Sequence, residues 1–482
     1  MTLRIAIIGA GLGGIAAAVK LTTSTRAGIT IFEQSAGVGG TWYDNRYPGC
    51  EVDVHSHAYS FSFLGYDWSR THATQAELLA YANHVVDRFG LREHLRLSTR
   101  VTGLVWEEAS STYTLSTEHG DSHEFDVVVS ALGLLSVPRY PGWPGLDTFA
   151  GPVFHTSRWE QHDLTGKSVA VVGTGSTAVQ IVPAIAPTAA QVYVYQREPG
   201  WIEPKYERDF SPRERWIYRH VPLAQRLNRA RIFHKGNRRF KGYDVGSRRQ
   251  RRMREACERF INGTITDPAV RKAVTPGYPW GCKRPILSST FYESLNRDNV
   301  SLVPQAVTRV FPGAVEDATG SVRDIDVLIL STGFQPTRFL AGLDVKGRDG
   351  RGLHDVWRER ATAFMGITVP GFPNFFILYG PNTNGGVSVI AQLERQAEVV
   401  VAAVRRLART RRRTIDTSPA AARRFTAWVD KRLASNASAM NAGCHNYYHD
   451  GSGHNVTQWP GGHLAYALAT RLVARFGLRS PS

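Results

Sequence analysis

Short apolar runs that end in glycine recur along the chain and predict the strands of parallel sheets. The run "RIAII" (residues 4–8) leads into a glycine turn and then into the small-residue stretch "IAAAVKL" (15–21), which predicts strand, turn and helix. The run "SVAVV" (168–172) repeats this arrangement before "GTGSTAVQIVPAI" (173–185). Strands that alternate with helices are typical of α/β folds. We therefore predict an α/β chain with two Rossmann-like dinucleotide-binding domains.

The first glycine turn has the spacing of a dinucleotide-binding motif. Gly9 allows the tight turn, Gly11 lets the backbone approach a pyrophosphate, and Gly14 lets the helix lie close to the sheet. The next apolar run, "ITIFEQS", ends with Glu33, which is placed to accept a hydrogen bond from a ribose hydroxyl. Strand, helix and acid together predict a nucleotide site rather than an accidental loop.

The second glycine turn carries Gly173, Gly175 and, at the third position, Ala178. Here the following run, "QVYVYQREPGW", ends in Arg197 instead of an acid. An arginine at this position accommodates the 2′-phosphate of NADPH, so this turn predicts NADPH rather than NADH. An ordinary surface cation is the alternative interpretation of Arg197.

Two nucleotide sites, one with an acid and one with a cation, indicate that two different nucleotides meet. Hydride transfer from NADPH to a flavin is the common reason for such a pair. Two further apolar runs, "FDVVVSALG" (125–133) and "VRDIDVLILSTGF" (322–334), also end in small residues. The turn at Gly333 lets the backbone pass close to FAD. Both runs are typical of segments in which the chain passes from one nucleotide-binding domain back to the other.

Length and composition limit the remaining possibilities. A chain of 482 residues is expected to form two or three domains, and no apolar run approaches the roughly 18 residues that cross a bilayer. The opening "MTLRIAIIGAG" runs directly into a strand and leaves no room for a signal peptide. The four cysteines match no zinc or CxxC spacing, so a reducing cytoplasm is the simplest interpretation. The oligomeric state cannot be predicted.

The charge of the chain is strongly positive, with a net value of +17 and a pI near 9.9. Much of the excess lies in 205–254, as in "KGNRRFKG" and "RRQRRMRE". This segment has few aromatic residues and no motif that reads bases, so we expect no specific nucleic-acid partner. Solvated faces of an arginine-rich helical insertion, or attraction of a phosphorylated cofactor, explain the charge better.

The segment "FAGPVFHTSRWE" carries Phe149, Gly151, His155 and Trp159 at the spacing of a family fingerprint, although Glu160 departs from the usual Pro or Asp. With "GGTWYDNRYPGCEVDVHSHAYSFSF", "VPGFPNFFILYGPNT" and "GCHNYYHDGSGHNVTQWPGG", nearly the whole chain resembles a class B flavoprotein monooxygenase of the Baeyer–Villiger type. Related amine and sulfide oxygenases usually have Tyr or Phe where Trp159 stands.

The resemblance implies a discontinuous FAD domain, formed by 1–140 and 331–482. An NADPH domain would occupy 150–330, with a helical insertion at about 205–275. The two linkers would pass near 140–155 and 325–335. His155 and Trp159 would lie at the linker, where they couple domain motion or simply pack.

The pair Lys283–Arg284 in "YPWGCKRPILSS" matches functional positions of the family. The resemblance implies that Arg284 faces the flavin peroxide, that Asp53 provides its counter-charge, and that Lys283 joins Arg197 at the 2′-phosphate. A solvated basic pair is the alternative. Arginine suits this role because it stays charged, whereas a desolvated lysine could lose its proton. The remaining cofactor-binding residues that the resemblance implies are Gly40, Thr41, Trp42, Ser176 and Trp459.

The implied reaction inserts one oxygen atom of dioxygen beside a ketone carbonyl, through a peroxyflavin, and gives an ester or lactone. Lowering the pKa of the peroxide by one unit requires about 1.4 kcal/mol, and a charged hydrogen bond supplies about 1.5–3 kcal/mol. An N- or S-oxygenating flavin monooxygenase on the same scaffold is the main alternative. Disulfide reductase chemistry is excluded because Cys50 has no nearby second cysteine, and His55 and His57 have no partners that would complete a metal site.

Overall fold

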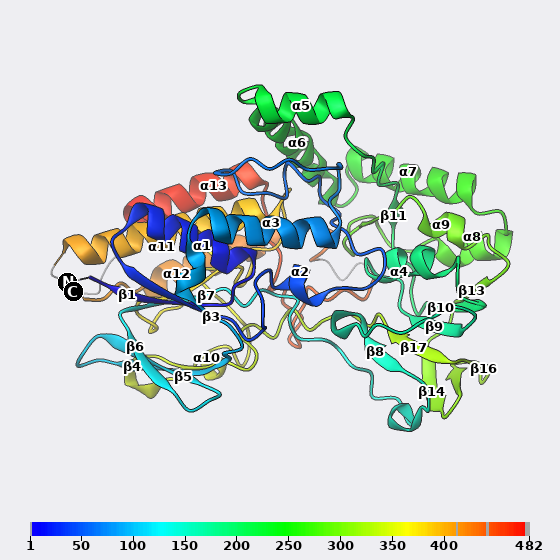
Figure 1. Cartoon of the computed structure of the whole chain (residues 1–482), viewed down its shortest axis with the longest axis horizontal. Helices are drawn as coiled ribbons and strands as arrows, with labels where there is room; N and C mark the ends of the chain where they lie inside the picture. Colours follow the sequence, from blue (N-terminus) through cyan, green and yellow to red (C-terminus); the bar gives the residue numbers. More distant parts are fainter. Residues whose placement is uncertain (1, 411–412, 440–442, 478–482) are drawn as a thin grey trace.

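The chain folds into two halves that lie side by side, each built on a five-stranded parallel sheet (Figure 1). The structure is a computed structural model that describes residues 2–410, 413–439 and 443–477. The expected α/β architecture with parallel sheets is confirmed.

The first sheet has the strand order β19-β7-β1-β2-β3. Its strands are β1 (Arg4–Ile8), β2 (Gly28–Phe32), β3 (Leu95–Arg96), β7 (Val127–Ser130) and β19 (Phe375–Ile377). The helices α1 (Leu12–Ser24), α3 (Gln75–Arg88) and α11 (Val389–Arg409) lie above the sheet in Figure 1. Because alanines 16, 17 and 18 of α1 are completely buried, this helix packs close to its neighbours.

The strands of a mixed four-stranded sheet cover the other side of the first sheet in Figure 1. They are β4 (Val101–Glu107), β5 (Thr112–Thr117), β6 (Ser122–Phe125) and β18 (Asp344–Lys346). Their inward residues Leu104, Tyr113 and Leu115 are completely buried. The first sheet is thus enclosed on both faces, as its continuous apolar strands require.

The second sheet has the order β13-β10-β9-β17-β8. Its strands are β8 (Val153–His155), β9 (Ser168–Val172), β10 (Gln191–Tyr195), β13 (Val300–Val303) and β17 (Val327–Leu330). It is accompanied by α4 (Ala178–Ile185) and α9 (Phe291–Ser294), and by the antiparallel strands β14 (Val307–Phe311), β15 (Ala314–Asp317) and β16 (Val322–Asp324).

A helical insertion leaves the second half after β10. It contains α5 (Pro212–His220), α6 (Ala224–Phe240), α7 (Arg248–Thr264) and α8 (Pro268–Val274). The short strands β11 (Ile202–Glu203) and β12 (Ile286–Leu287) pair in parallel and close its base. The basic pair 283–284 therefore lies where the insertion returns to the sheet.

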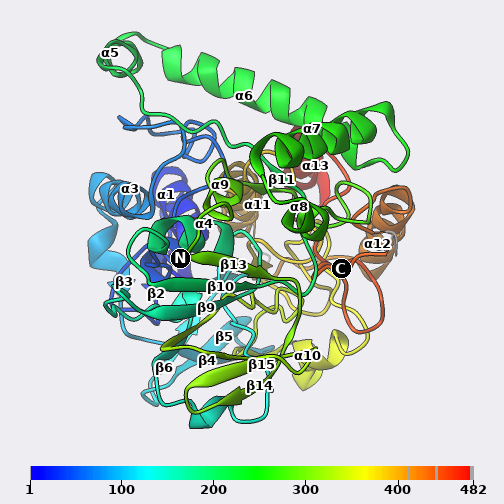
Figure 2. The same ribbon diagram turned by 90° about the vertical axis from the view of Figure 1, so that its right-hand side faces the viewer.

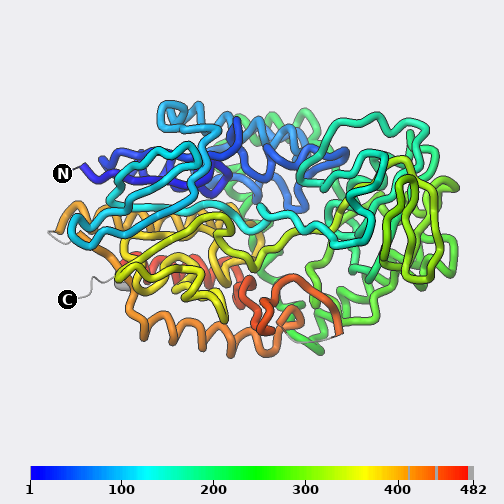
Figure 3. Tube along the Cα trace, turned by 90° about the horizontal axis from the view of Figure 1, so that it is seen from below, coloured from blue at the N-terminus to red at the C-terminus, as the bar shows by residue number. Residues whose placement is uncertain are grey.

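Two segments cross between the halves, and they run next to each other (Figure 3). Pro138 forms an antiparallel bridge with Phe334, and the N–H of Gln335 donates to the carbonyl of Val137 at 3.0 Å. The predicted domain boundaries remain predictions, but the strands of the first sheet come from 4–130 and 375–377, and those of the second from 153–330.

The C-terminal part of the chain returns to the first half. It contains α10 (Leu353–Val356), α12 (Pro419–Leu433) and α13 (His463–Leu472). No helix in the described residues is long and apolar enough to span a bilayer.

Candidate active site between two nucleotide turns

The first glycine turn follows β1 directly. Gly9 has φ +103°, a conformation that favours glycine. A Cβ atom on Gly14 would lie 1.8 Å from the carbonyl oxygen of Gly9, so only glycine lets α1 begin this close to the strand. The backbones of Gly11 and Gly40 are in close contact. A Cβ atom added to Gly40 would lie only 2.9 Å from the Cα atom of Gly11. The two segments form a backbone cradle at the start of α1, suited to a phosphate group.

Glu33 at the end of β2 holds this turn. It is buried, and its two carboxylate oxygens accept hydrogen bonds from the N–H groups of Ala10 (2.7 Å) and Ser35 (2.9 Å). Burial raises the pKa of Glu33 above its usual value. The described contacts of this carboxylate are structural, and its hydrogen bond to a ribose remains a prediction.

The segment Gly40–Trp42 forms the opposite wall of the cradle. Gly40 has φ +55° and precedes the short helix α2 (Thr41–Asp44). Trp42 is buried and meets Tyr59 edge to face, with 5.7 Å between ring centroids. The indole Nε1 of Trp42 is buried and forms no well-aligned hydrogen bond among the described residues, although the side chain of Trp42 interacts with the Tyr59 phenol.

The second glycine turn follows β9. Gly173 has φ +115°, and a Cβ there would lie 2.4 Å from the carbonyl oxygen of Ser331. At Gly175, in contrast, a Cβ would meet no atom within 4 Å, and Ser176 is exposed. The turn is therefore tight on its inner side and open on its outer side, where a pyrophosphate could lie.

His155 and Gly333 join the two crossing segments. The Nε2–H of His155 donates to the carbonyl oxygen of Gly333 at 2.9 Å, while the N–H of Ser157 donates to His155 Nδ1 at 3.2 Å. Burial lowers the pKa of His155, which keeps the imidazole neutral. Trp159 packs against Phe154 beside them. These contacts support the prediction that this motif connects the halves.

Arg284 and Asp53 meet across the two halves of the molecule. Arg284 Nη2 donates to Asp53 Oδ2 at 2.5 Å, although 231 residues separate them. The Asp53 carboxylate raises the pKa of the Arg284 guanidinium above its usual range. The side chain of Arg284 is still 44% exposed, so part of the guanidinium surface is available to a ligand. The arrangement can hold a permanent positive charge in a fixed orientation.

A group of tyrosines surrounds this ion pair, and the sequence did not single them out. Electrostatic interactions with Arg284 connect it to Tyr59, Tyr243, Tyr379, Tyr447 and Tyr448. Burial raises the pKa of Tyr59 to about 12, and it raises the pKa of the other four as well. All five phenols therefore keep their protons at neutral pH. Four of the five lie in the segments that carry the family resemblance, and that resemblance is the sequence signal that could have identified them.

Lys283 faces a different direction from Arg284. Its ammonium forms an ion pair with Glu198 and lies 5.3 Å from the centroid of the Tyr278 ring. Burial lowers the pKa of Lys283. Arg197 is exposed next to Glu198 in the chain. A 2′-phosphate at this position would compete with Glu198 for Lys283. Glu198, unlike Lys283, was not predicted from the sequence.

A disulfide joins Cys282 to Cys444 beside this site. The cysteine spacing did not predict it, because the two residues are 162 positions apart. The bond fixes the segment after Cys444 against the basic pair. There, Asn446 Nδ2 donates to the carbonyl of Cys282 at 3.1 Å, and the N–H of His445 donates to Glu198 at 3.3 Å.

Trp459 lies in an aromatic cluster. It is buried, and its ring meets Trp428 at 5.3 Å and Tyr466 at 4.9 Å between centroids. Its Nε1 has no hydrogen-bond partner among the described residues. Contact with a nicotinamide ribose remains a prediction for this residue.

His55 and His57 pack with aromatic neighbours. Burial lowers the pKa of His55 to about 4 and that of His57 to about 3, so both are neutral. His57 stacks on Phe210 at 5.2 Å. In the described part of the chain, no group of three or more His, Cys, Asp or Glu residues could hold a metal ion.

The sequence is similar to known proteins along nearly its whole length. Residues 6–221 match a family of pyridine nucleotide-disulphide oxidoreductases. The chain is 38% identical to a Baeyer–Villiger monooxygenase of Streptomyces coelicolor, over 98% of this chain and 91% of that protein. It is 37% identical to a Baeyer–Villiger monooxygenase of Pseudomonas aeruginosa, over 97% and 89%.

The fold is similar to solved structures of the same kind. An oxidized steroid monooxygenase bound to NADP superposes with a TM-score of 0.88 at 30% identity, with 99% of each chain covered. Cyclohexanone monooxygenase from Rhodococcus sp. Phi1, bound to NADP+, gives 0.89 at 29% identity over 100% of each chain. A complex of OTEMO with FAD and NADP gives 0.88 at 28% identity, with 99% of each chain covered.

Proposed function

Because the chain belongs to the Baeyer–Villiger monooxygenase family, it is an NADPH-dependent flavoprotein monooxygenase, and we propose that its substrate is a ketone. The enzyme would insert one oxygen atom of dioxygen beside the carbonyl and release an ester or lactone. The Arg284–Asp53 pair, which joins the two halves of the molecule, is the observation that carries this proposal.

The two glycine turns fit the cofactors that the family uses. The chain binds FAD and NADPH. We assign FAD to the cradle of Gly9, Gly11, Gly14 and Gly40, and the NADPH pyrophosphate to the open side of Gly175. Bound FAD supplies the activation of dioxygen. The backbone N–H groups at the start of α1 are donors that would orient it, and Trp42 lies in the opposite wall of the cradle.

Arg284 and Asp53 have different electrostatic roles in this proposal. Arg284 would stabilise negative charge that develops on oxygen during the reaction, because its guanidinium keeps its proton at any working pH. Asp53 would orient the guanidinium and partly compensate its charge through a charge-assisted hydrogen bond, while the exposed part of the Arg284 side chain stays available to a ligand. Tyr59, Tyr379 and their neighbours, which stay protonated, would limit the access of water to the pair.

The proposal is tested by product analysis with the purified holoenzyme. The yellow protein should consume NADPH faster than NADH and form esters or lactones from a panel of cyclic, linear and aryl ketones. Consumption of NADPH and oxygenated product must be measured together, because uncoupled oxidation also consumes NADPH. Formation of only sulfoxides or N-oxides, when sulfides and amines are offered in parallel, would reject ketone oxygenation in favour of the alternative.

We expect the Cys282–Cys444 disulfide to support coenzyme binding. Cys444→Ser should raise the KM for NADPH about 3- to 10-fold and change kcat less. The reason is that the segment after Cys444, with its contacts to Glu198, must then be ordered when the coenzyme binds, at about 0.5–1.5 kcal/mol for each side chain. Initial rates against NADPH concentration provide the measurement.

The matched control for this variant is Cys257→Ala, which removes a buried free thiol of α7. Its KM should stay that of the natural chain. An equal KM in the Cys444 variant would show that the disulfide does not contribute to coenzyme binding.

A cytoplasmic location remains a prediction, and structural disulfides are uncommon in that compartment.

A further inference from the structure

Two helices of the insertion stand away from both sheets. Figure 2 shows α5 and α6 along the outer edge of the molecule, and neither helix contains a buried residue. Monomeric soluble proteins rarely expose large contiguous apolar patches. We call α5, α6 and the turn between them the hairpin. The chemistry derived above does not require it, so its surface needs its own explanation.

The turn between α5 and α6 exposes large apolar side chains. Trp216 is 58% exposed, Leu223 58% and Leu227 69%, and Val221 between them is exposed as well. Leu223 has φ +66°, a conformation that is uncommon for a leucine. The tip of the hairpin therefore presents an apolar surface to solvent. Glycine or asparagine would adopt the backbone conformation of Leu223 more easily than leucine does.

A second apolar stripe lies on α13. Leu464, Leu468 and Leu472 follow each other at four-residue spacing and are 63%, 52% and 61% exposed. The opposite side of α13 buries Tyr466 and Thr470. Four-residue spacing places the three leucines on one face of the helix, so they form a continuous stripe.

The two apolar surfaces are connected through α6, because the start of α13 contacts the C-terminal half of that helix. The N–H of His463, at the start of α13, donates to Asn237 Oδ1 on α6 at 2.9 Å, and the His463 ring lies 4.6 Å from that of Phe233. Figures 1 and 2 show α13 below α5 and α6, near the end of α6 that is remote from α5. We name this surface the hairpin edge; it comprises Trp216, Val221, Leu223, Leu227, Leu464, Leu468 and Leu472.

Cations flank the hairpin edge. The helix α6 carries no carboxylate, and its exposed Arg226, Arg231, Lys235 and Arg238 continue from the apolar tip along the helix. Residues 223, 227, 231 and 235 follow at four-residue spacing, so two leucines and two cations share one stripe. The edge thus combines exposed apolar side chains with positive charge.

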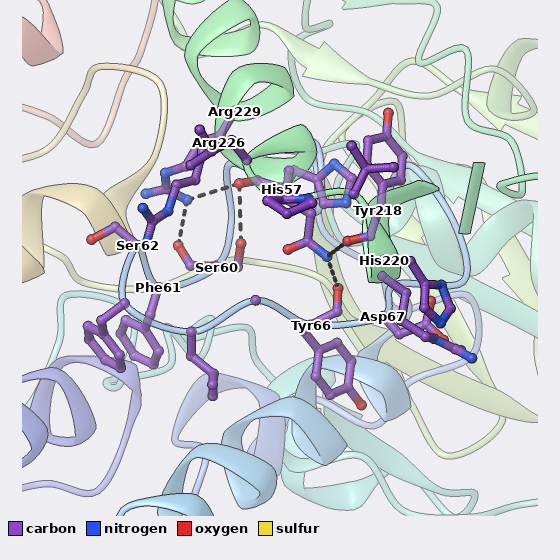
Figure 4. A pocket seen from close by; sticks show the side chains of 18 residues that line it. His57, Ser60, Phe61, Ser62, Tyr66, Asp67, Tyr218, His220, Arg226 and Arg229 are labelled. Carbon is purple, nitrogen blue, oxygen red and sulfur yellow. Dashed lines mark hydrogen bonds and ion pairs between the residues drawn. The ribbon is translucent and has the colours of Figure 1, made fainter. Parts of the chain in front are cut away.

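A cavity of about 430 Å³ opens beneath the tip (Figure 4). Val221 and Leu223 of the hairpin edge line it, together with Phe61 and Tyr218. On its inner side, Arg229 donates to the carbonyl oxygen of Ser60 at 2.6 Å and anchors α6 to the first half. A surface that docks on the tip would therefore also cover the mouth of this cavity.

We propose that the hairpin edge docks on a bilayer that contains anionic lipids. Leucine and tryptophan side chains are buried at the boundary between headgroups and acyl chains, and the adjacent cations bind the anionic headgroups. A second copy of the chain fits less well, because both copies carry the same positive edge and a net charge of +17. Nucleic acid would use the cations but leaves the seven apolar residues without a role.

The proposal is tested by sedimentation of the FAD-containing enzyme with vesicles. We expect binding to vesicles of phosphatidylcholine and phosphatidylglycerol, and weaker binding to phosphatidylcholine alone. The double variant Leu223→Ser/Leu227→Ser, like Leu464→Ser/Leu468→Ser, should need at least about tenfold more lipid for half-maximal binding, because the apolar contribution scales with buried CH2 groups. The matched control Val322→Ser alters an exposed residue of β16 and should bind like the natural chain.

Specific outcomes overturn the proposal. The proposal is rejected if the natural chain does not bind the anionic vesicles at low salt. It is also rejected if the natural chain and both leucine variants bind equally well. Retention on double-stranded DNA without binding to vesicles would assign the edge to nucleic acid. A concentration-dependent dimer that the leucine variants abolish, again without vesicle binding, would assign it to a second copy. Flavin content should be unchanged in all variants, which separates these outcomes from a loss of folding.

Discussion

Replacement of Arg284 by alanine is expected to lower kcat/KM for ketone oxygenation at least roughly 10²-fold, while FAD stays bound. In the natural chain, the guanidinium is held by Asp53 at 2.5 Å, and the Arg284 side chain is 44% exposed. Alanine removes the fixed positive charge that stabilises developing negative charge on oxygen. It also leaves Asp53 without its partner. Product formation per NADPH consumed, together with the flavin absorbance, provides the measurement.

Two further variants separate catalysis from folding. Arg284→Lys keeps a positive charge, but an ammonium has an ordinary pKa of about 10.4 whereas a guanidinium stays protonated, so any remaining activity should be lost as the pH rises through the titration of the lysine. The natural enzyme should not show this loss, because Asp53 raises the pKa of Arg284. Arg252→Ala, which removes an exposed cation of α7, should have no effect. Normal ester formation by the Arg284→Ala variant would remove this residue from the mechanism.

Replacement of Gly14 by alanine is expected to give a protein with little bound FAD. The added Cβ would lie 1.8 Å from the carbonyl oxygen of Gly9, so either the turn or the start of α1 must move. Overpacking of this kind costs about 1–3 kcal/mol, which corresponds to roughly 5- to 150-fold weaker binding if the displaced turn is the one that holds the cofactor. The ratio of flavin to protein absorbance after gel filtration is the direct measurement.

The matched control for Gly14 is Gly28→Ala at the start of β2. A Cβ at Gly28 would meet no atom within 4 Å, and this glycine is exposed. Gly28→Ala should therefore remain yellow. Circular dichroism of both variants distinguishes loss of FAD from loss of folding, and a fully yellow Gly14 variant would contradict the assignment of the cradle.

The sequence by itself determined the local elements of this protein and its family. Each glycine turn depends on a few consecutive residues, so the strands before Gly9 and Gly173 and the helices after them could be predicted from the apolar pattern. The α/β class, FAD and NADPH followed from the same segments. These predictions succeeded because backbone conformation at a glycine and burial of an apolar strand are local properties.

Only the tertiary structure decided which distant residues meet. The pairing of Arg284 with Asp53 could be proposed by resemblance, but the distance depends on how β11 and β12 return the insertion to the second sheet. Glu198 beside Lys283 was not predicted, nor were the tyrosines around the ion pair. The Cys282–Cys444 disulfide and the shared edge of α6 and α13 likewise join segments far apart in the chain. Such contacts depend on the path of the whole backbone, which no local pattern of residues specifies.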